Sequence, residues 1–258
     1  WYNSTVGAFK IGTSSDGAWA SGGALNTARY RGGGGGVGIL TAGMVFGGYS
    51  TSAGAYLAQV EQYNGTSWTE GPMADYPSVT GDVGQCGTTT AAIGVCGNST
   101  SPVNEVYVGN GSTWSAGENY PAAHERIGVA GLSTSAVAVG GASTATDGTW
   151  EYDGSTWTSG GNYTHSGSNI GISGIQTAAL AEGGYGGTTA AATYNGTAWT
   201  SITATSTARE EHGWSTNGTT TDTMAFGSPA NTEKWDGSSW TEIANVSTPR
   251  TAGFGLGT

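Results

Sequence analysis

The arginines are the residues whose positions most suggest a binding site. Five of the seven basic residues, Arg29, Arg31, Arg126, Arg209 and Arg250, precede or open glycine-rich stretches. If these side chains gather at one opening, they would form a cationic ring that suits an anionic ligand, such as a sugar acid or a partner's carboxylate. In the alternative interpretation, each guanidinium braces the fold against backbone carbonyls or a neighbouring repeat's acid. Recurrence at equivalent sites favours this bracing role, and the ligand hypothesis stays open.

Further residues depart from the pattern of the repeats. Glu182 stands where other repeats carry an apolar residue, which favours an inward-pointing acid paired with an arginine, although a site residue is the alternative. Several aromatics outside the repeat pattern are candidates for stacking on a sugar ring: Tyr49, Tyr56, Tyr76, Tyr120, Tyr163, Tyr185 and Trp214. A glycan-cleaving enzyme would need a pair of carboxylates about 5–10 Å apart. Glu182, Glu210 and Glu211 are the candidates for such a pair.

Metal and nucleophile chemistry find little support in the sequence. His124, His165 and His212 occur in the same loop of consecutive repeats, and loop histidines facing solvent are the favoured interpretation. The chain has no Gly-x-Ser-x-Gly elbow, and the glycine run at 32–36 lacks the lysine of a phosphate-binding loop. We therefore expect no catalytic residues, no metal and no cofactor.

The elements that position these residues are recurring β-hairpins. In Glu151–Gly161, a strand ending at Tyr152 is followed by an Asp-Gly turn and a strand starting at Trp157. Asp-Gly and Asn-Gly suit a tight hairpin turn, because glycine adopts positive φ freely and Asn or Asp tolerates it. The repeats are anchored by six tryptophans, Trp19, Trp68, Trp114, Trp157, Trp199 and Trp240, at spacings of 49, 46, 43, 42 and 41 residues. A period of 40–50 residues built from short strands indicates a β-propeller.

Each repeat contains four expected strands, of which the first is the richest in glycine. Small residues fit where inner strands converge on an axis, and large aromatics fill the gaps between splayed outer strands. The six predicted first strands are 31–39, 81–86, 127–132, 170–175, 213–216 and 252–256. We predict one all-β domain over residues 1–258, a six-bladed propeller. Its last blade would close by pairing the C-terminal strand with the N-terminal segment, and would be three-stranded or irregular.

The glycine doublet followed by tyrosine and tryptophan resembles the kelch repeat. The doublet is intact at Gly47-Gly48, Gly140-Gly141 and Gly183-Gly184. This resemblance covers nearly the whole chain, and it implies the fold without fixing a function, since kelch propellers act as scaffolds, as lectin-like binders and occasionally as enzymes. The hairpin idiom, followed by Asn-Thr-Ala-Arg in an acidic chain rich in Gly, Ser and Thr, resembles kelch-like structural proteins of marine bacteriophages.

Composition limits the classes of partner. With a formal net charge of −11, the chain lacks the cluster of basic residues that binds nucleic acids or anionic membranes. No apolar run is long enough to span a bilayer. Because the chain starts at Trp1 without a signal-peptide pattern, we expect a processed product or a piece of a longer protein. Cys86 and Cys96 lie on neighbouring expected strands, and two buried free thiols are favoured over a disulfide.

Three functional hypotheses follow from these observations. The leading one is a non-enzymatic, extracellular virion component of the capsid-decoration or tail-fibre type, which binds a host surface glycan or another virion protein. The second is a secreted carbohydrate-binding propeller, in which exposed aromatics stack on sugars. The third and least favoured is a glycan-active enzyme. Neither nucleic acid nor membrane insertion is expected, and a homo-oligomer is compatible with each hypothesis.

Overall fold

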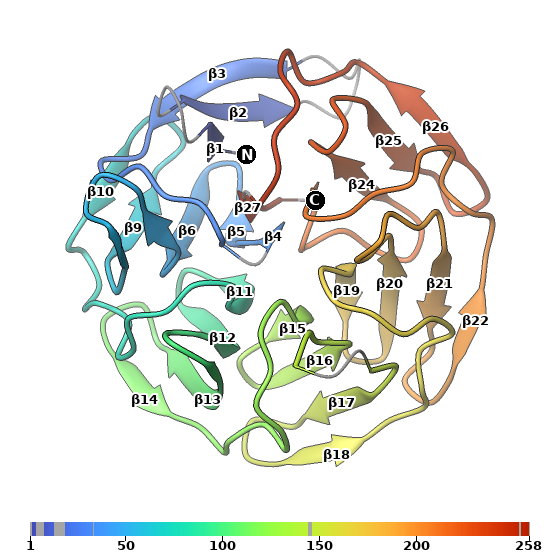
Figure 1. The fold of residues 1–258 in the computed structure, drawn as a ribbon, viewed down its shortest axis with the longest axis horizontal. Coiled ribbons are helices and arrows are strands. Elements are labelled where there is room, and N and C mark those ends of the chain that lie inside the picture. Colours follow the sequence, from blue (N-terminus) through green and yellow to red (C-terminus); the bar gives the residue numbers. More distant parts are fainter. Residues whose placement is uncertain are drawn as a thin grey trace.

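The protein is an all-β propeller whose sheets are arranged radially around one axis (Figure 1). The computed structural model describes residues 2–3, 8–12, 19–32, 34–143, 146–252 and 254–257. No helix occurs among these residues. In the view along the axis, the first strands of the sheets lie nearest the centre and the fourth strands at the periphery, as the distribution of glycine and tryptophan predicts.

Five of the sheets have four antiparallel strands each. The first contains β5 (Val37–Ile39), β6 (Ala42–Phe46), β9 (Val60–Tyr63) and β10 (Trp68–Glu70). The second contains β11 (Gly84–Thr88), β12 (Ala91–Asn98), β13 (Pro102–Gly109) and β14 (Trp114–Ala116). The third contains β15 (Gly128–Leu132), β16 (Ser135–Val139), β17 (Thr149–Tyr152) and β18 (Trp157–Ser159). The fourth contains β19 (Gly171–Ile175), β20 (Ala178–Glu182), β21 (Ala191–Tyr194) and β22 (Trp199–Ser201). The fifth contains β23 (Gly213–Trp214), β24 (Thr223–Phe226), β25 (Thr232–Trp235) and β26 (Trp240–Ile243).

All six anchoring tryptophans open an outer strand, as predicted. Five begin β10, β14, β18, β22 and β26, and Trp19 begins β3 (Trp19–Ala24). Their indole rings also link neighbouring sheets, because Nε1 of Trp114, Trp157 and Trp240 donates to backbone carbonyls of the preceding connection at 3.0–3.1 Å. These three tryptophans therefore connect their own outer strand to the connection that precedes it.

The hairpin turns use their Asn or Asp in a different way from the one predicted. Gly154 has a φ of 94°, whereas Asp153 is not among the residues with positive φ. The Asp153 carboxylate instead accepts the amide hydrogens of Ser155 and Thr156, at 2.8 and 2.7 Å. The same side-chain contact recurs at the turns that contain Asn64, Asn110, Asn195 and Asp236. Only the glycine requires unusual backbone geometry, and the Asn or Asp satisfies the amides of the turn.

The structure does not show the predicted six blades, nor their predicted closure by strand pairing of the two chain ends. Five blades are four-stranded. The N-terminal sheet has three strands, β1 (Tyr2–Asn3), β2 (Ala8–Gly12) and β3. The C-terminal strand β27 (Phe254–Gly255) pairs in parallel with β4 (Gly34–Gly35) and not with the N-terminal sheet. The predicted first strand at 31–39 is accordingly divided between β4 and β5.

The glycine run has a structural role that the sequence did not reveal. Strand β4 lies close to the propeller axis (Figure 1) and contacts the inner strands β11, β15, β19 and β23. A Cβ atom on Gly35 would lie 2.8 Å from the Gln85 carbonyl oxygen, and one on Gly255 only 2.3 Å from the Trp214 oxygen. Only glycine allows backbones to approach this closely. Gly34 and Gly35 of the run therefore form an axial packing element.

The two ends of the propeller differ in their loops. One end, the ring face, carries the segments that enter the inner strands. There, six residues, here called the mouth ring, all have φ between 47° and 59°: Arg31, Asp82, Arg126, Asn169, Glu211 and Ala252. Five backbone hydrogen bonds of 2.6–2.9 Å connect successive members, including Arg31 N–H to Ala252 and Ala252 N–H to Glu211. The opposite end, the turn face, carries the hairpin turns between first and second and between third and fourth strands.

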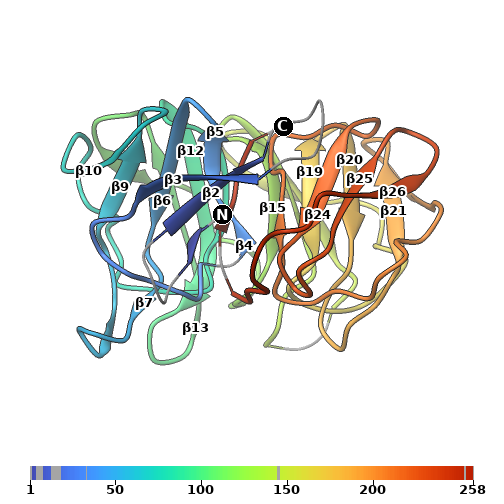
Figure 2. The same ribbon diagram turned by 90° about the horizontal axis from the view of Figure 1, so that it is seen from above.

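Two local features complete the fold. The long link at residues 47–57 forms an additional hairpin, β7 (Tyr49–Ser50) and β8 (Ala55–Tyr56), which extends from the ring face (Figure 2). Cys86 and Cys96 are free and buried, as favoured from the sequence, and Cys86 lies opposite Ile93 in the sheet. Burial raises the pKa of both thiols, that of Cys96 to about 12.

Candidate functional site

Arg29 and Arg209 do not line an open cationic ring. Both are buried, and each pairs with a buried glutamate of the sheet that it precedes: Arg29 with Glu61 at 2.7 Å and Arg209 with Glu233 at 3.0 Å. The glutamates also accept backbone amides, from Asn26 and Thr27 at Glu61 and from Ser206 and Thr207 at Glu233. These two repeated units, here called latches, fasten the incoming loop to the sheet. They match the bracing interpretation.

Glu182 pairs with a histidine and not with an arginine. Its carboxylate lies 2.6 Å from Nε2 of His212, and both side chains are buried. Trp214 is also buried, on the inner strand β23, with its ring centroid 5.6 Å from that of His212. An aromatic in this position packs beside the axis and offers no open face to a sugar. Arg250 lies in the loop before β27, where its amide donates to the Gly227 carbonyl.

Arg31 and Arg126 are the predicted arginines that reach the mouth ring. Arg31 lies 2.6 Å from Asp82, while Arg126 lies farther from its acids, 3.8 Å from Asp82 and 3.7 Å from Glu211. Burial raises the pKa of Asp82, although the guanidinium groups of Arg31 and Arg126 oppose that effect. Since each arginine already faces carboxylates, the mouth ring has mixed charge and gives an anionic ligand no net attraction.

A pocket of about 340 Å³ opens beside Arg126 on the ring face. Its lining residues are Glu125, Arg126, Gly141, Ala142, Gly167, Ser168 and Tyr185. We call it the Tyr185 pocket. It brings together the aromatic ring of Tyr185, the carboxylate of Glu125 and the guanidinium of Arg126. The Glu125 carboxylate also accepts a hydrogen bond from the Asn98 side-chain amide.

Tyr185 is 68% exposed, the largest exposure among the large hydrophobic side chains that the structure describes. Its loop is nonetheless firmly held, since every amide from Gly183 to Gly187 donates a hydrogen bond. The acceptors are the carbonyls of Ala190, Arg209, Ser168 and Gly184 and, for Gly186, the Glu210 carboxylate at 2.9 Å. Equivalent Tyr49 packs edge-on against Tyr30 and Tyr56, whereas Tyr185 has no ring contact within the described part of the chain. A rigid loop therefore presents an open aromatic face.

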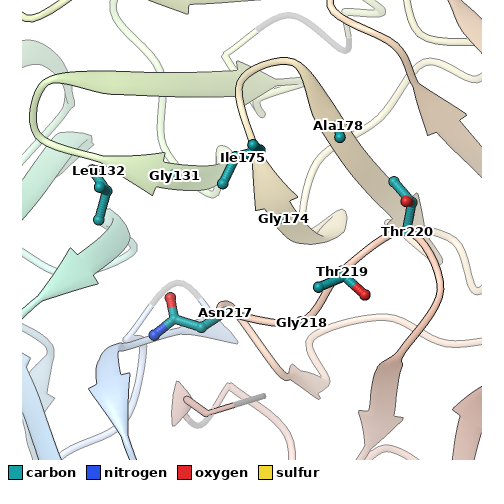
Figure 3. A pocket seen from close by; sticks show the side chains of 9 residues that line it. All are labelled: Gly131, Leu132, Gly174, Ile175, Ala178, Asn217, Gly218, Thr219 and Thr220. Atoms are coloured by element: carbon teal, nitrogen blue, oxygen red, sulfur yellow. The ribbon is translucent and has the colours of Figure 1, made fainter.

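The turn face carries a second pocket, of about 290 Å³. Figure 3 shows Leu132 and Ile175 projecting from adjacent inner strands, with the turn from Asn217 to Thr220 facing them. Gly131, Gly174, Ala178 and Gly218 complete the lining. We call it the Ile175 pocket. It lies at the opposite end of the propeller from the Tyr185 pocket.

Sequence reasoning included Arg126 and Tyr185 among its candidates and missed Asp82 and Glu125. Asp82 occupies a mouth-ring position that holds Arg, Asn, Glu or Ala in other repeats, so no repeated residue type marks that position. Of the three histidines, His165 is exposed, whereas His124 and His212 are buried, so the expectation of solvent-facing loop histidines holds only for His165. Within the described ranges, no group of three or more His, Cys, Asp or Glu side chains is placed to hold a metal ion.

Comparison with known proteins adds no assignment. No family model matches the chain, and no curated protein matches it at a significant level. The described residues include no helix long and apolar enough to cross a membrane. The two pockets are therefore the features of the molecule from which a function can be inferred.

Proposed function

We propose that this protein is a non-enzymatic attachment module that binds an uncharged saccharide in the Tyr185 pocket. The supporting observation is the exposed face of Tyr185, held rigidly beside Glu125 and Arg126. Sugar rings present C–H faces that pack on aromatic rings, and their hydroxyls donate to carboxylates and accept from guanidinium groups. A rigid platform also reduces the entropy lost on binding.

An uncharged sugar is preferred over a sugar acid because of the local charge. Arg126 already faces Asp82 and Glu211, and Glu125 lies in the pocket itself. An added carboxylate would meet three acids, Asp82, Glu125 and Glu211, against the two arginines Arg31 and Arg126, within a chain of net charge −11. Hydroxyl groups carry no such penalty.

Catalysis is not part of the proposal, because the candidate acids have other partners. Glu182 is buried against His212, Glu210 accepts the Gly186 amide, and Glu211 lies beside Arg126. A labelled glycan that binds the protein should therefore be recovered intact after prolonged incubation. Release of a shorter product would move the assignment to a glycan-active enzyme.

Binding is tested on an array of neutral and acidic glycans, followed by titration of the best ligand. Tyr185→Ala should weaken binding about tenfold, since an aromatic contact of about 1.4 kcal/mol corresponds to that factor. The substitution reproduces the Ala142 that occupies the equivalent place in the neighbouring repeat, so the fold should tolerate it. Val79→Ala, at another exposed position of the ring face, is the control and should bind normally. Equal affinity of all three proteins would reject the Tyr185 pocket as the site.

A virion is the setting that the repeat idiom supports, through its resemblance to kelch-like structural proteins of marine phages. In that setting the partners are a host surface glycan and another virion protein, and the location is extracellular. Co-sedimentation with capsids or tails at fixed stoichiometry is expected. A monomer free in the culture medium would favour the secreted carbohydrate-binding alternative.

We also infer that β1–β3 and β27 together take the place of a sixth, kelch-like blade. Trp19 Nε1 donates to the Ala244 carbonyl at 2.8 Å, the same kind of bond to the preceding connection that Trp114 makes. Ala252 likewise occupies one place in the mouth ring. Hydrogen exchange tests this, because residues 2–3 and 254–256 should be protected together. Rapid exchange at 2–3 beside a protected 254–256 would contradict it.

A further inference from the structure

Large apolar side chains are exposed at one repeated position of the turn face. Ile39, Leu132 and Ile175 each end an inner strand, and they are 45%, 39% and 55% exposed. The equivalent residue of β11 is Thr88, so the fold does not require an apolar side chain there. Leaving leucine and isoleucine in water forgoes favourable burial, which an occupant of this end would recover.

Leu132 and Ile175 flank a concave site, not a flat patch. Gly131 and Gly174 have φ of 107° and 112°, and a Cβ on either would lie within 2.4 Å of a carbonyl oxygen of the next strand. The wall between the two apolar side chains is therefore bare backbone. Together with the turn that holds Thr219, it encloses the pocket of about 290 Å³ (Figure 3).

Polar groups at the edge of this pocket already have partners. Asn217 Nδ2 donates to the Gly38 carbonyl at 2.9 Å, and Thr219 Oγ1 accepts the amide hydrogens of Thr221 and Asp222. A ligand here would gain mainly by burying apolar surface. A charged group would lose its hydration without finding a counter-charge in the lining.

We propose that the Ile175 pocket binds a small uncharged molecule whose apolar body is the size of a fused aromatic ring system. A cavity of roughly 150 Å³ lined by Leu, Ile and Phe accepts benzene, and this pocket has about twice that volume. The site lies at the opposite end of the propeller from the Tyr185 pocket, so it does not depend on the saccharide proposal.

The test is a ¹⁹F NMR titration with 6-fluoroindole as the probe. Wild-type protein should bind the probe saturably. Ile175→Thr should weaken binding at least tenfold, because it replaces the apolar Ile175 side chain with threonine, the residue that β11 has at the equivalent position, Thr88. Ile39→Thr is the matched control, since Ile39 has the same repeat position and similar exposure but does not line the pocket. Its affinity should stay within twofold of wild type.

Two results would overturn the proposal. One is the absence of saturable binding to the wild-type protein, and the other is an equal affinity of the wild-type, Ile175→Thr and Ile39→Thr proteins. Leu132→Thr provides a second variant at the other wall if Ile175→Thr fails to fold, and it should show the same weakening. Tyr185→Ala should leave 6-fluoroindole binding unchanged, which separates the outcome from that of the saccharide test.

Discussion

Removing the guanidinium of one latch should destabilise the propeller by an amount that depends on what else that guanidinium holds. Arg209→Met leaves Glu233 buried without its counter-ion. Loss of one partner from a buried ion pair costs about 3–5 kcal/mol. Glu233 keeps the Ser206 amide and hydroxyl at 2.7 and 2.8 Å and the Thr207 amide at 3.3 Å, which continue to stabilise its charge. We therefore expect the low end, a fall of about 3 kcal/mol in the free energy of unfolding.

The second latch provides an internal comparison. Arg29 pairs with Glu61 and also donates from Nη1 to the carbonyls of Gly47 and Gln59, at 2.9 and 2.8 Å. Arg209 Nη1 has no hydrogen-bond partner among the described residues. At about 1 kcal/mol for each hydrogen bond, Arg29→Met should cost about 5 kcal/mol.

Urea unfolding followed by tryptophan fluorescence measures both losses, and calorimetry should show a fall in Tm of roughly 6–12 °C for Arg209→Met. The double variant Arg209→Met, Glu233→Met should recover part of the loss, because it removes the unpaired buried charge. Two results would refute the reasoning: a double variant less stable than Arg209→Met by the full cost of a second independent lesion, or an Arg29→Met less destabilising than Arg209→Met.

Three further predictions follow from local geometry. Gly131→Ala should lower the free energy of unfolding by more than about 1 kcal/mol, because its Cβ would lie 2.4 Å from the Ser135 oxygen at a φ of 107°; a melting curve identical to wild type would contradict this. Glu233 is buried, which opposes its ionisation, but hydrogen bonds from Ser206 and Arg209 lower its pKa. Its contribution to stability is therefore complete above the ordinary glutamate pKa and is lost as pH falls through the lowered value. Stability measured from pH 6 to 3 should decline less in Glu233→Gln than in wild type. The Cys96 thiol, with its pKa raised to about 12, should react with a disulfide reagent only after unfolding, and fast labelling of native protein would disprove its burial.

The repeats made the architecture predictable, because each of the six anchoring tryptophans, which recur at nearly constant spacing, begins an outer strand. The same reasoning failed where one residue type serves two positions. Arg29 and Arg31 are two residues apart, yet one is buried in a latch and the other lies in the mouth ring. No period separates these roles, since the difference arises from the left-handed backbone at Arg31.

The glycine run and the pockets were beyond sequence reasoning for a related reason. Gly34 and Gly35 pack at the axis against strands far along the chain, and glycine carries no side chain to indicate such contacts. Exposure of Tyr185 depends on which aromatic neighbours reach it, and Tyr49 shows that the same repeat position can be covered. The sequence included Tyr185 among the aromatics outside the repeat pattern but could not rank it.

The axial strand β4 makes the propeller depend on the C-terminal strand β27, with which it pairs. Strand β4 appears early in the chain, yet its partner β27 follows more than 200 residues later, and the inner strands that it touches belong to four sheets in between. Contacts of such long sequence separation form slowly and late in folding. The blades cannot then act as independent units that are gained or lost one at a time. A chain without β27 would lose the strand that holds β4 on the axis and, with it, the contacts of β4 with β11, β15 and β19.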